Sequence, residues 1–160
     1  MVLQRLGMNR PPDPSAEGPV WEAENLNPVY SEGCSGLVRQ TAGFGNGWSR
    51  DAQLFCVGPR GGTVTLPFRL DKTSAGELSI SMTVAPDFAI AAFLLDKKPI
   101  GDPLDTYAPE VASSGKISLG NVTLAQGVHK LTVKVVGWNP KMEGDKEFGR
   151  LGIDYISFKF

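Results

Sequence analysis

Alternation of apolar and polar residues, repeated in three separate segments, is the feature that most constrains the fold of this chain. From Leu78 to Val84 every second side chain is apolar, and serine or threonine lies between. Residues 62–70 and 127–137 follow a similar pattern. Successive side chains of a strand point to opposite faces, so this period of two predicts strands with one buried face. We expect these strands in two antiparallel sheets around one core, with six residues nearly inaccessible: Leu66, Phe68, Ile80, Met82, Leu131 and Val133.

The other segments extend the pattern to roughly eight or nine strands without a convincing helix, which is typical of a β-sandwich. Residues 88–96 are apolar at both parities, as in a strand buried on both sides or covered by another segment. Pro67 lacks a backbone donor, so its strand should have an edge or a bulge there. We predict an all-β jelly roll over residues 20–160, preceded by a proline-rich linker over residues 1–19.

Composition excludes some classes of partner. The 16 Lys and Arg residues nearly balance the 17 Asp and Glu residues, so no broad field for nucleic acid or a membrane surface is indicated. No apolar run approaches the ~20 residues of a membrane span. The N-terminal residues lack the apolar core of a secretory signal, which also fits a chain cut from a longer exported protein. Cys34 and Cys56 either form one bridge or remain two buried thiols.

The residues that catalysis usually needs are scarce. His129 is the single histidine, and it shares strand parity with Leu131 and Val133, so we interpret it as a packed strand residue. Cysteine and histidine do not cluster at metal-ligand spacing. The glycine-rich strings GFGNGW and GPRGGT lack the spacing of nucleotide-binding loops. A carboxylate pair for glycoside hydrolysis stays open, but the chain is not expected to be an enzyme.

Aromatic residues beside polar groups in predicted loops suggest a sugar-binding site. Sugars lay their C–H faces on exposed rings, and their hydroxyl groups need amide, carboxylate and guanidinium partners. Core packing is the alternative explanation for the tryptophans. The candidate carbohydrate-binding residues are Trp48, Arg50, Asp87, Asp105, Tyr107, Trp138 and Asn139.

Five strings in order give the chain a family resemblance: GWSRDAQLF, APDFAIAAFLLDKKPIG, DTYAPEV, LAQGVHKLTVKVVGWNP and GIDYISF. Together they resemble the β-sandwich module found C-terminal to DUF2961 domains, which are related to glycoside hydrolase family 172. The opening WEAENL and the closing GIDYISF are also similar to the terminal strands of carbohydrate-binding module families 6 and 35, which are galactose-binding-like jelly rolls. The resemblance implies an accessory module of an exported polysaccharide-degrading or cell-surface protein, extracellular or periplasmic, next to a catalytic domain.

The second resemblance also implies a structural calcium ion. In modules of families 6 and 35, the first and last strands are neighbours and share this ion. Carried over, the ligands here are Glu22 or Glu24 on one face of the first strand, Asp154 in the last strand, and backbone carbonyl groups. Hard oxygen ligands of this kind are those that calcium prefers. Solvated carboxylates on a sheet edge are the alternative interpretation.

The function we expect is therefore that of a non-catalytic carbohydrate-binding module, with a polysaccharide or oligosaccharide as its ligand. One alternative is a structural or adhesive sandwich that packs against a catalytic domain, which an exposed apolar patch without a polar cleft would favour. The other is a small glycoside hydrolase or lyase, which needs a cleft with two convergent carboxylates or a base of perturbed pKa.

Overall fold

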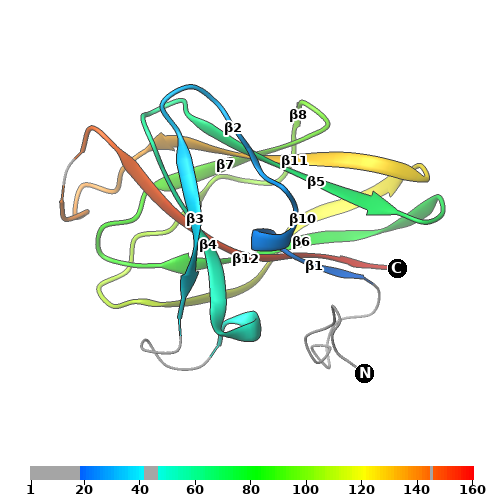
Figure 1. Cartoon of the computed structure of the whole chain (residues 1–160), viewed down its shortest axis with the longest axis horizontal. Helices are drawn as coiled ribbons and strands as arrows, with labels where there is room; N and C mark the ends of the chain where they lie inside the picture. The colour runs from blue at the N-terminus through cyan, green and yellow to red at the C-terminus, as the bar shows by residue number, and fades with distance from the viewer. Residues whose placement is uncertain (1–18, 42–46, 145) are drawn as a thin grey trace.

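Two antiparallel sheets packed face to face make up the computed structural model of the chain, which describes residues 19–41, 47–144 and 146–160 (Figure 1). The predicted all-β sandwich is thus confirmed. The predicted linker, except Pro19, lies outside the described residues. The helices among the described residues are single 3-10 turns, and none is long and apolar enough to cross a membrane.

The first sheet, here called the β12 sheet, has the strand order β10-β6-β12-β4-β3, and β1 also pairs with β12. Its strands are β1 (Val20–Glu22), β3 (Ser35–Gln40), β4 (Ala52–Gly58), β6 (Ser74–Val84), β10 (Ala112–Leu124) and β12 (Gly149–Lys159). The first half of β12 pairs with β4, and its second half pairs with β1. The start and the end of the described chain therefore lie side by side in one sheet (Figure 1).

The second sheet, here called the β11 sheet, has the order β2-β5-β11-β7-β8, and β9 also pairs with β7. Its strands are β2 (Val29–Tyr30), β5 (Thr63–Leu70), β7 (Ile90–Leu95), β8 (Lys98–Pro99), β9 (Leu104–Asp105) and β11 (Gly127–Gly137). Strand β2 pairs only with Val64 and Thr65 of β5. Pro67 therefore lies where β5 forms the edge of the sheet, as its missing N–H predicts.

The core lies between the two sheets and is built from alternate residues of each strand. The six side chains expected to be inaccessible are all at most 2% exposed. In β7 one parity is buried and the other is half-buried, so this strand faces the core on one side only. Asp96 and Lys97 adopt positive φ angles in the tight turn between β7 and β8, which agrees with the turn predicted there.

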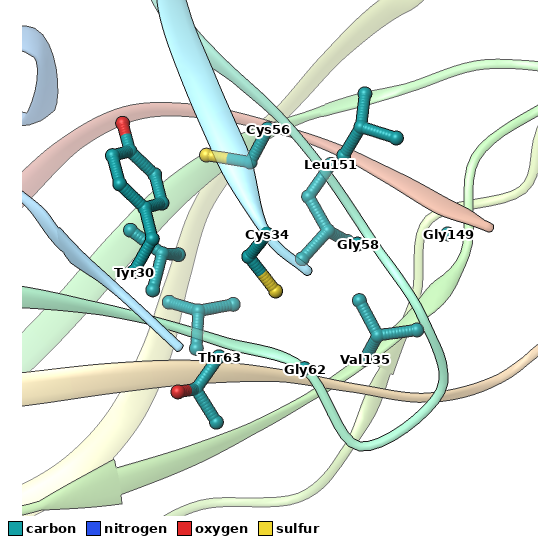
Figure 2. Close-up of a pocket in the computed structure, with 12 residues that line it drawn as sticks. Tyr30, Cys34, Cys56, Gly58, Gly62, Thr63, Val135, Gly149 and Leu151 are labelled. Atoms are coloured by element: carbon teal, nitrogen blue, oxygen red, sulfur yellow. The ribbon is translucent and has the colours of Figure 1, made fainter. Parts of the chain in front are cut away.

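The two cysteines are free thiols that line one small cavity between the sheets (Figure 2). Its volume of about 10 Å³ offers room for no more than about one water molecule. Burial, with a smaller effect from Cys34, raises the pKa of Cys56 to about 12. The Cys34 sulfur lies against Gly58 and Gly62, where an added Cβ would come within 2.3 and 2.4 Å of it. The cavity is therefore a packing feature and not a ligand site.

Candidate functional site

A groove of about 360 Å³ crosses the outer face of the β12 sheet. Its residues on β4, β6 and β12 have the parity opposite to the core residues Leu54, Met82 and Leu151, so they point away from the core. We call it the face groove. Its lining residues are Arg39, Gln53, Phe55, Thr83, Ala85, Asp87, Phe88, Val111 and Arg150.

The apolar lining of the face groove comes from Phe55, Ala85, Phe88 and Val111, of which Phe88 is only 6% exposed. The ring centroids of Phe55 and Phe88 lie 6.0 Å apart at an angle of 45°. The guanidinium carbon of Arg39 lies 4.7 Å from the centre of the Phe55 ring, within the range of a cation–π contact. Phe55 is half-buried and Arg39 is exposed, so this corner combines an apolar surface with hydrogen-bond donors.

A buried hydrogen-bond relay supports the floor of the groove. The Trp48 indole N–H donates to the Thr83 hydroxyl at 2.7 Å, and this hydroxyl donates to Gln53 Oε1. Gly152 lies beneath the relay, and a Cβ there would come within 2.1 Å of Gln53 Oε1. Trp48 is only 6% exposed. The expected role of Trp48 as an exposed stacking ring is therefore corrected: its ring packs below the groove, and its N–H is already used.

Arg150 and Asp87 form the charged end of the groove. The Arg150 Nε and Asp87 Oδ2 atoms are 3.9 Å apart, which is an ion pair but not a hydrogen bond. Asp87 is the predicted site residue that lines the groove itself. Arg39, Gln53, Phe55 and Arg150 were not predicted, because outward polar residues on a strand look like ordinary solvated positions.

Three further predicted residues gather beside the groove. The Asn139 amide donates to Asp105 Oδ2 at 2.7 Å, and Asp105 Oδ1 accepts the Tyr107 backbone N–H at 3.0 Å. Tyr107 forms an isolated bridge with Ala85, which lines the groove. We call Asp105, Tyr107 and Asn139 the rim cluster. The fold brings these three residues together, and the bridge between Tyr107 and Ala85 links them to the face groove.

The other two predicted site residues lie outside both groups. Trp138 is half-buried against the core, and its indole N–H donates to the Phe148 carbonyl at 3.4 Å. The Arg60 guanidinium carbon lies 5.9 Å from the centre of this indole ring. Arg50 lies in the 3-10 turn η3 (Ser49–Asp51) with a positive φ of 56°, where its charge acts on Glu24.

The acidic residues proposed as calcium ligands lie around Ser49. Its backbone N–H contacts both carboxylate oxygens of Asp154 at 3.1 Å, and its hydroxyl donates to Glu22 Oε2 at 2.6 Å. Glu22 ends β1, and Glu24 lies in the 3-10 turn η1 (Ala23–Asn25), closed by the Leu26 N–H on the Ala23 carbonyl. The prediction that Glu22 and Glu24 share one face of a strand is therefore wrong, because the strand stops at Glu22.

The residue types of this acidic cluster suit calcium, but the distances between them do not. Glu24 Oε1 is buried and has no hydrogen-bond partner among the described residues. Burial raises the pKa of Glu24 to about 7. A backbone hydrogen bond lowers this pKa, and the charge of Glu22 raises it further. Buried carboxylate oxygens suit a hard cation. However, no three acidic, histidine or cysteine side chains in the described ranges gather closely enough to hold a metal ion as they stand.

His129 is tied to its surroundings through both ring nitrogens. Its Nδ1 lies 2.7 Å from Asp96 Oδ2, and its Nε2 lies 2.7 Å from the Ala125 carbonyl oxygen. Both partners are acceptors, so the arrangement favours the doubly protonated ring. Burial alone lowers the pKa of His129, but the bonds to Asp96 and Ala125 raise it above its ordinary value. His129 therefore acts as a strand-to-turn clamp, in line with its predicted packing role.

Comparison with known proteins identifies the fold. A scan against protein-family models finds no match, and neither does a search of curated proteins. Among solved structures, a Paenibacillus xanthan lyase matches 92% of this chain with a TM-score of 0.75 and 16% identity. This chain covers only 14% of that lyase.

Two isolated modules match along nearly their whole length. The CBM36-1 domain of a xylanase from the hindgut metagenome of Trinervitermes trinervoides gives a TM-score of 0.54 at 9% identity, covering 89% of this chain and 96% of that domain. A family 35 carbohydrate-binding module from Clostridium thermocellum gives 0.51 at 9% identity, covering 89% and 98%. The chain therefore has the β-sandwich fold of carbohydrate-binding modules, as its resemblance to family 35 implied.

Proposed function

We propose that this chain is a non-catalytic carbohydrate-binding module that holds a polysaccharide in the face groove. The observation that carries the proposal is the groove itself, where the half-buried Phe55 ring lies beside arginine, amide and carboxylate groups. Sugar rings need this combination of an apolar surface and polar partners. The fold, shared with carbohydrate-binding modules, supports the proposal.

A binding role fits the groove better than hydrolysis. Glycoside hydrolysis usually requires two carboxyl groups flanking the scissile bond. Among the lining side chains that the structure describes, Asp87 is the one carboxyl group. His129 and its Asp96 partner are absent from this lining and are engaged with each other.

The rim cluster extends the proposed site beyond the groove. Asp105 is oriented by the Asn139 amide, and Asn139 in turn accepts the Lys141 backbone N–H at 2.8 Å. Asp105 is exposed and Asn139 is half-buried, so both can meet the hydroxyl groups of a sugar neighbouring the one in the groove. We keep Trp138 as a candidate contact at this end, because its ring is only half-buried.

The wider setting is also part of the proposal. Because the chain covers a small part of the xanthan lyase, we infer that it works as one domain of a larger exported protein with a catalytic domain. A calcium ion at Glu22, Glu24 and Asp154 belongs to the same proposal, with a structural role. The DUF2961-type parent protein stays a prediction from the sequence.

Replacement of the stacking ring tests the function. Retention of the purified chain in gels containing single polysaccharides should reveal weak binding, with Kd values on the order of micromolar to millimolar. Phe55→Ala should remove most of this retention, because the loss of one anchoring side chain costs about 2 kcal/mol of binding.

Phe148→Ala is the matched control, since Phe148 is 43% exposed and does not line the groove. Its retention should equal that of the unmodified chain, and melting curves should show that both variants are folded. Equal retention of the Phe55 and Phe148 variants would contradict the proposed site. If no polysaccharide retains the unmodified chain, the structural sandwich becomes the better explanation.

A further inference from the structure

The hydrogen bonds below the face groove fix the polarity of its floor. An indole N–H can only donate, so the Thr83 hydroxyl accepts from Trp48 and in turn donates to Gln53 Oε1. This contact occupies the carbonyl end of the Gln53 amide. The amide NH₂ group, with two N–H donors, is therefore the end that Gln53 offers to the groove.

Arginine adds further donors on two sides. The Arg150 Nη1 atom is buried and has no hydrogen-bond partner among the described residues. The carboxylate of Asp87 is 3.9 Å from Arg150 Nε and does not satisfy the Nη1 nitrogen. The Arg39 guanidinium carbon lies over the Phe55 ring, 4.7 Å from its centre, and its N–H groups add donors beside the groove. A buried donor without a partner costs free energy, and the Arg150 side chain as a whole is 27% exposed, so a ligand acceptor can still reach its guanidinium group.

The sum of these groups is a donor-rich, positively charged groove. Two guanidinium groups face one carboxylate, and the Gln53 amide contributes donors only. A neutral sugar presents hydroxyl groups that must donate as well as accept, and Asp87 is the one side-chain carboxylate in the described lining that can receive them. A carboxylate on the ligand would instead accept from several of these donors at once.

We propose that the sugar bound in the face groove carries a carboxylate, as a uronic acid does. This inference rests on the proposed carbohydrate-binding function and names its ligand class. The ligand carboxylate accepts from Arg150 and Gln53, with Arg39 at the open side. The pyranose ring lies beside Phe55 and Arg39, and Asp87 accepts from a ring hydroxyl.

The test compares polysaccharides that differ only in this group. The probes are polygalacturonate, alginate and xanthan, each paired with its carboxyl-reduced form, in which CH₂OH replaces COO⁻. The full chain should bind at least one acidic form about tenfold or more tighter than its reduced partner, as expected for a charge-assisted hydrogen bond. Binding should also weaken as NaCl concentration rises.

Two groove variants and one control locate the effect. Gln53→Glu replaces the donor amide with a carboxylate of the same shape, and Arg150→Gln removes a guanidinium group. Each should lower affinity for the acidic form about tenfold or more, and clearly more than it lowers affinity for the reduced form. Arg69→Gln is the control, because Arg69 is exposed on β5 of the opposite sheet. If Gln53→Glu fails to fold, the affinity of the Arg150→Gln variant still tests the proposal, because Arg150 is only half-buried.

The outcomes separate this inference from the function on which it rests. Equal affinity for acidic and reduced forms, unchanged in Arg150→Gln, overturns the carboxylate proposal and leaves a module for neutral sugars. Equal losses in Arg69→Gln and Arg150→Gln also overturn it, because net charge alone would then explain the binding. Absence of binding to all six probes and to a neutral panel overturns both proposals.

Discussion

Gly152 shows how one missing side chain shapes the face groove. It lies on β12 opposite Phe55 of β4 on one side and Thr83 of β6 on the other. The absence of a Cβ lets the Gln53 side chain cross β12 and reach Thr83. The polar floor of the groove therefore depends on a residue that has no polar group of its own.

Substitution of Gly152 should consequently disturb both stability and binding. In Gly152→Ala the added Cβ would lie 2.1 Å from Gln53 Oε1 and 2.9 Å from Thr83 Cβ, so the amide must move. We expect a loss of about 1–3 kcal/mol in the free energy of unfolding, as for other overpacked sites. Urea unfolding measures this loss.

Gly137→Ala provides the comparison at this scale. Its added Cβ would meet only the end of the flexible Arg60 side chain, at 3.4 Å. This variant should unfold within about 1 kcal/mol of the unmodified chain, the usual cost of a Gly-to-Ala exchange in either direction. Equal destabilisation of the two variants would mean that the crossing of β12 by Gln53 is unimportant.

At the scale of elements, the turn between β7 and β8 is fastened to β11. Asp96 Oδ1 accepts the Lys130 N–H at 2.9 Å, and Asp96 Oδ2 faces His129. Burial alone raises the pKa of Asp96, but the bonds from His129 and Lys130 lower it below its ordinary value. One carboxylate thus joins a turn to the middle strand of the β11 sheet.

This clamp should make stability depend on pH. The pKa of His129 is raised in the folded chain, so its contribution is fully present below the ordinary value of 6.5 and is lost as pH rises through the folded value. The pKa of Asp96 is lowered, so its contribution is lost as pH falls through that lowered value. The clamp is therefore strongest between these two limits.

Asp96→Asn isolates the effect, because asparagine tolerates the positive φ of 49° at this position. Glu24 also titrates near pH 7, but it does so in both proteins and cancels in their difference. The difference in unfolding free energy, measured from pH 5 to pH 9, should be largest from pH 5 to pH 6 and shrink above pH 6.5. A difference that stays constant over this range would contradict the clamp.

The strands were predictable from the sequence to the extent that each has one buried face. β6 and β11 show this plainly, because Leu78, Ile80, Leu131 and Val133 alternate with polar residues and fill the core. The end of β1 was not predictable, since Glu24 continues the alternation while the backbone turns into η1. Local periodicity carries no information about where a turn interrupts a strand.

The site was predictable only in part, for a related reason. Asp105, Tyr107 and Asn139 were recognised because loops with aromatic and amide residues stand out in a sequence. Arg150 and Gln53 alternate with core residues and look like any solvated strand position. Only the strand order, which sets β4, β12 and β6 side by side, brings them together.

At the scale of the whole molecule, the acidic cluster joins the two ends of the described chain. Glu22 lies on β1, Asp154 lies on β12, and Ser49 bridges them from η3. A cation at this point would link three segments far apart in the sequence. Its effect should therefore be on global stability and not on the groove.

Removal of divalent ions tests the calcium proposal. An ion bound only to the folded state adds ~2.7 kcal/mol at a hundredfold excess over its dissociation constant. The melting temperature should therefore rise in calcium and fall in chelator, and Asp154→Asn should abolish the difference. Lys116→Gln serves as a charge-changing control on β10. Identical melting curves with calcium and with chelator would remove the support for this site.

The position of β12 has a consequence for how the protein is made. This strand is the most C-terminal one described, yet it lies between β4 and β6 and carries Arg150 and Gly152. When synthesis has reached the end of β11, every other described strand has been made, but the groove is still incomplete because β12 is missing. If the proposed function holds, ligand recognition arises only once β12 has been made, and a protease that removes this single segment abolishes it.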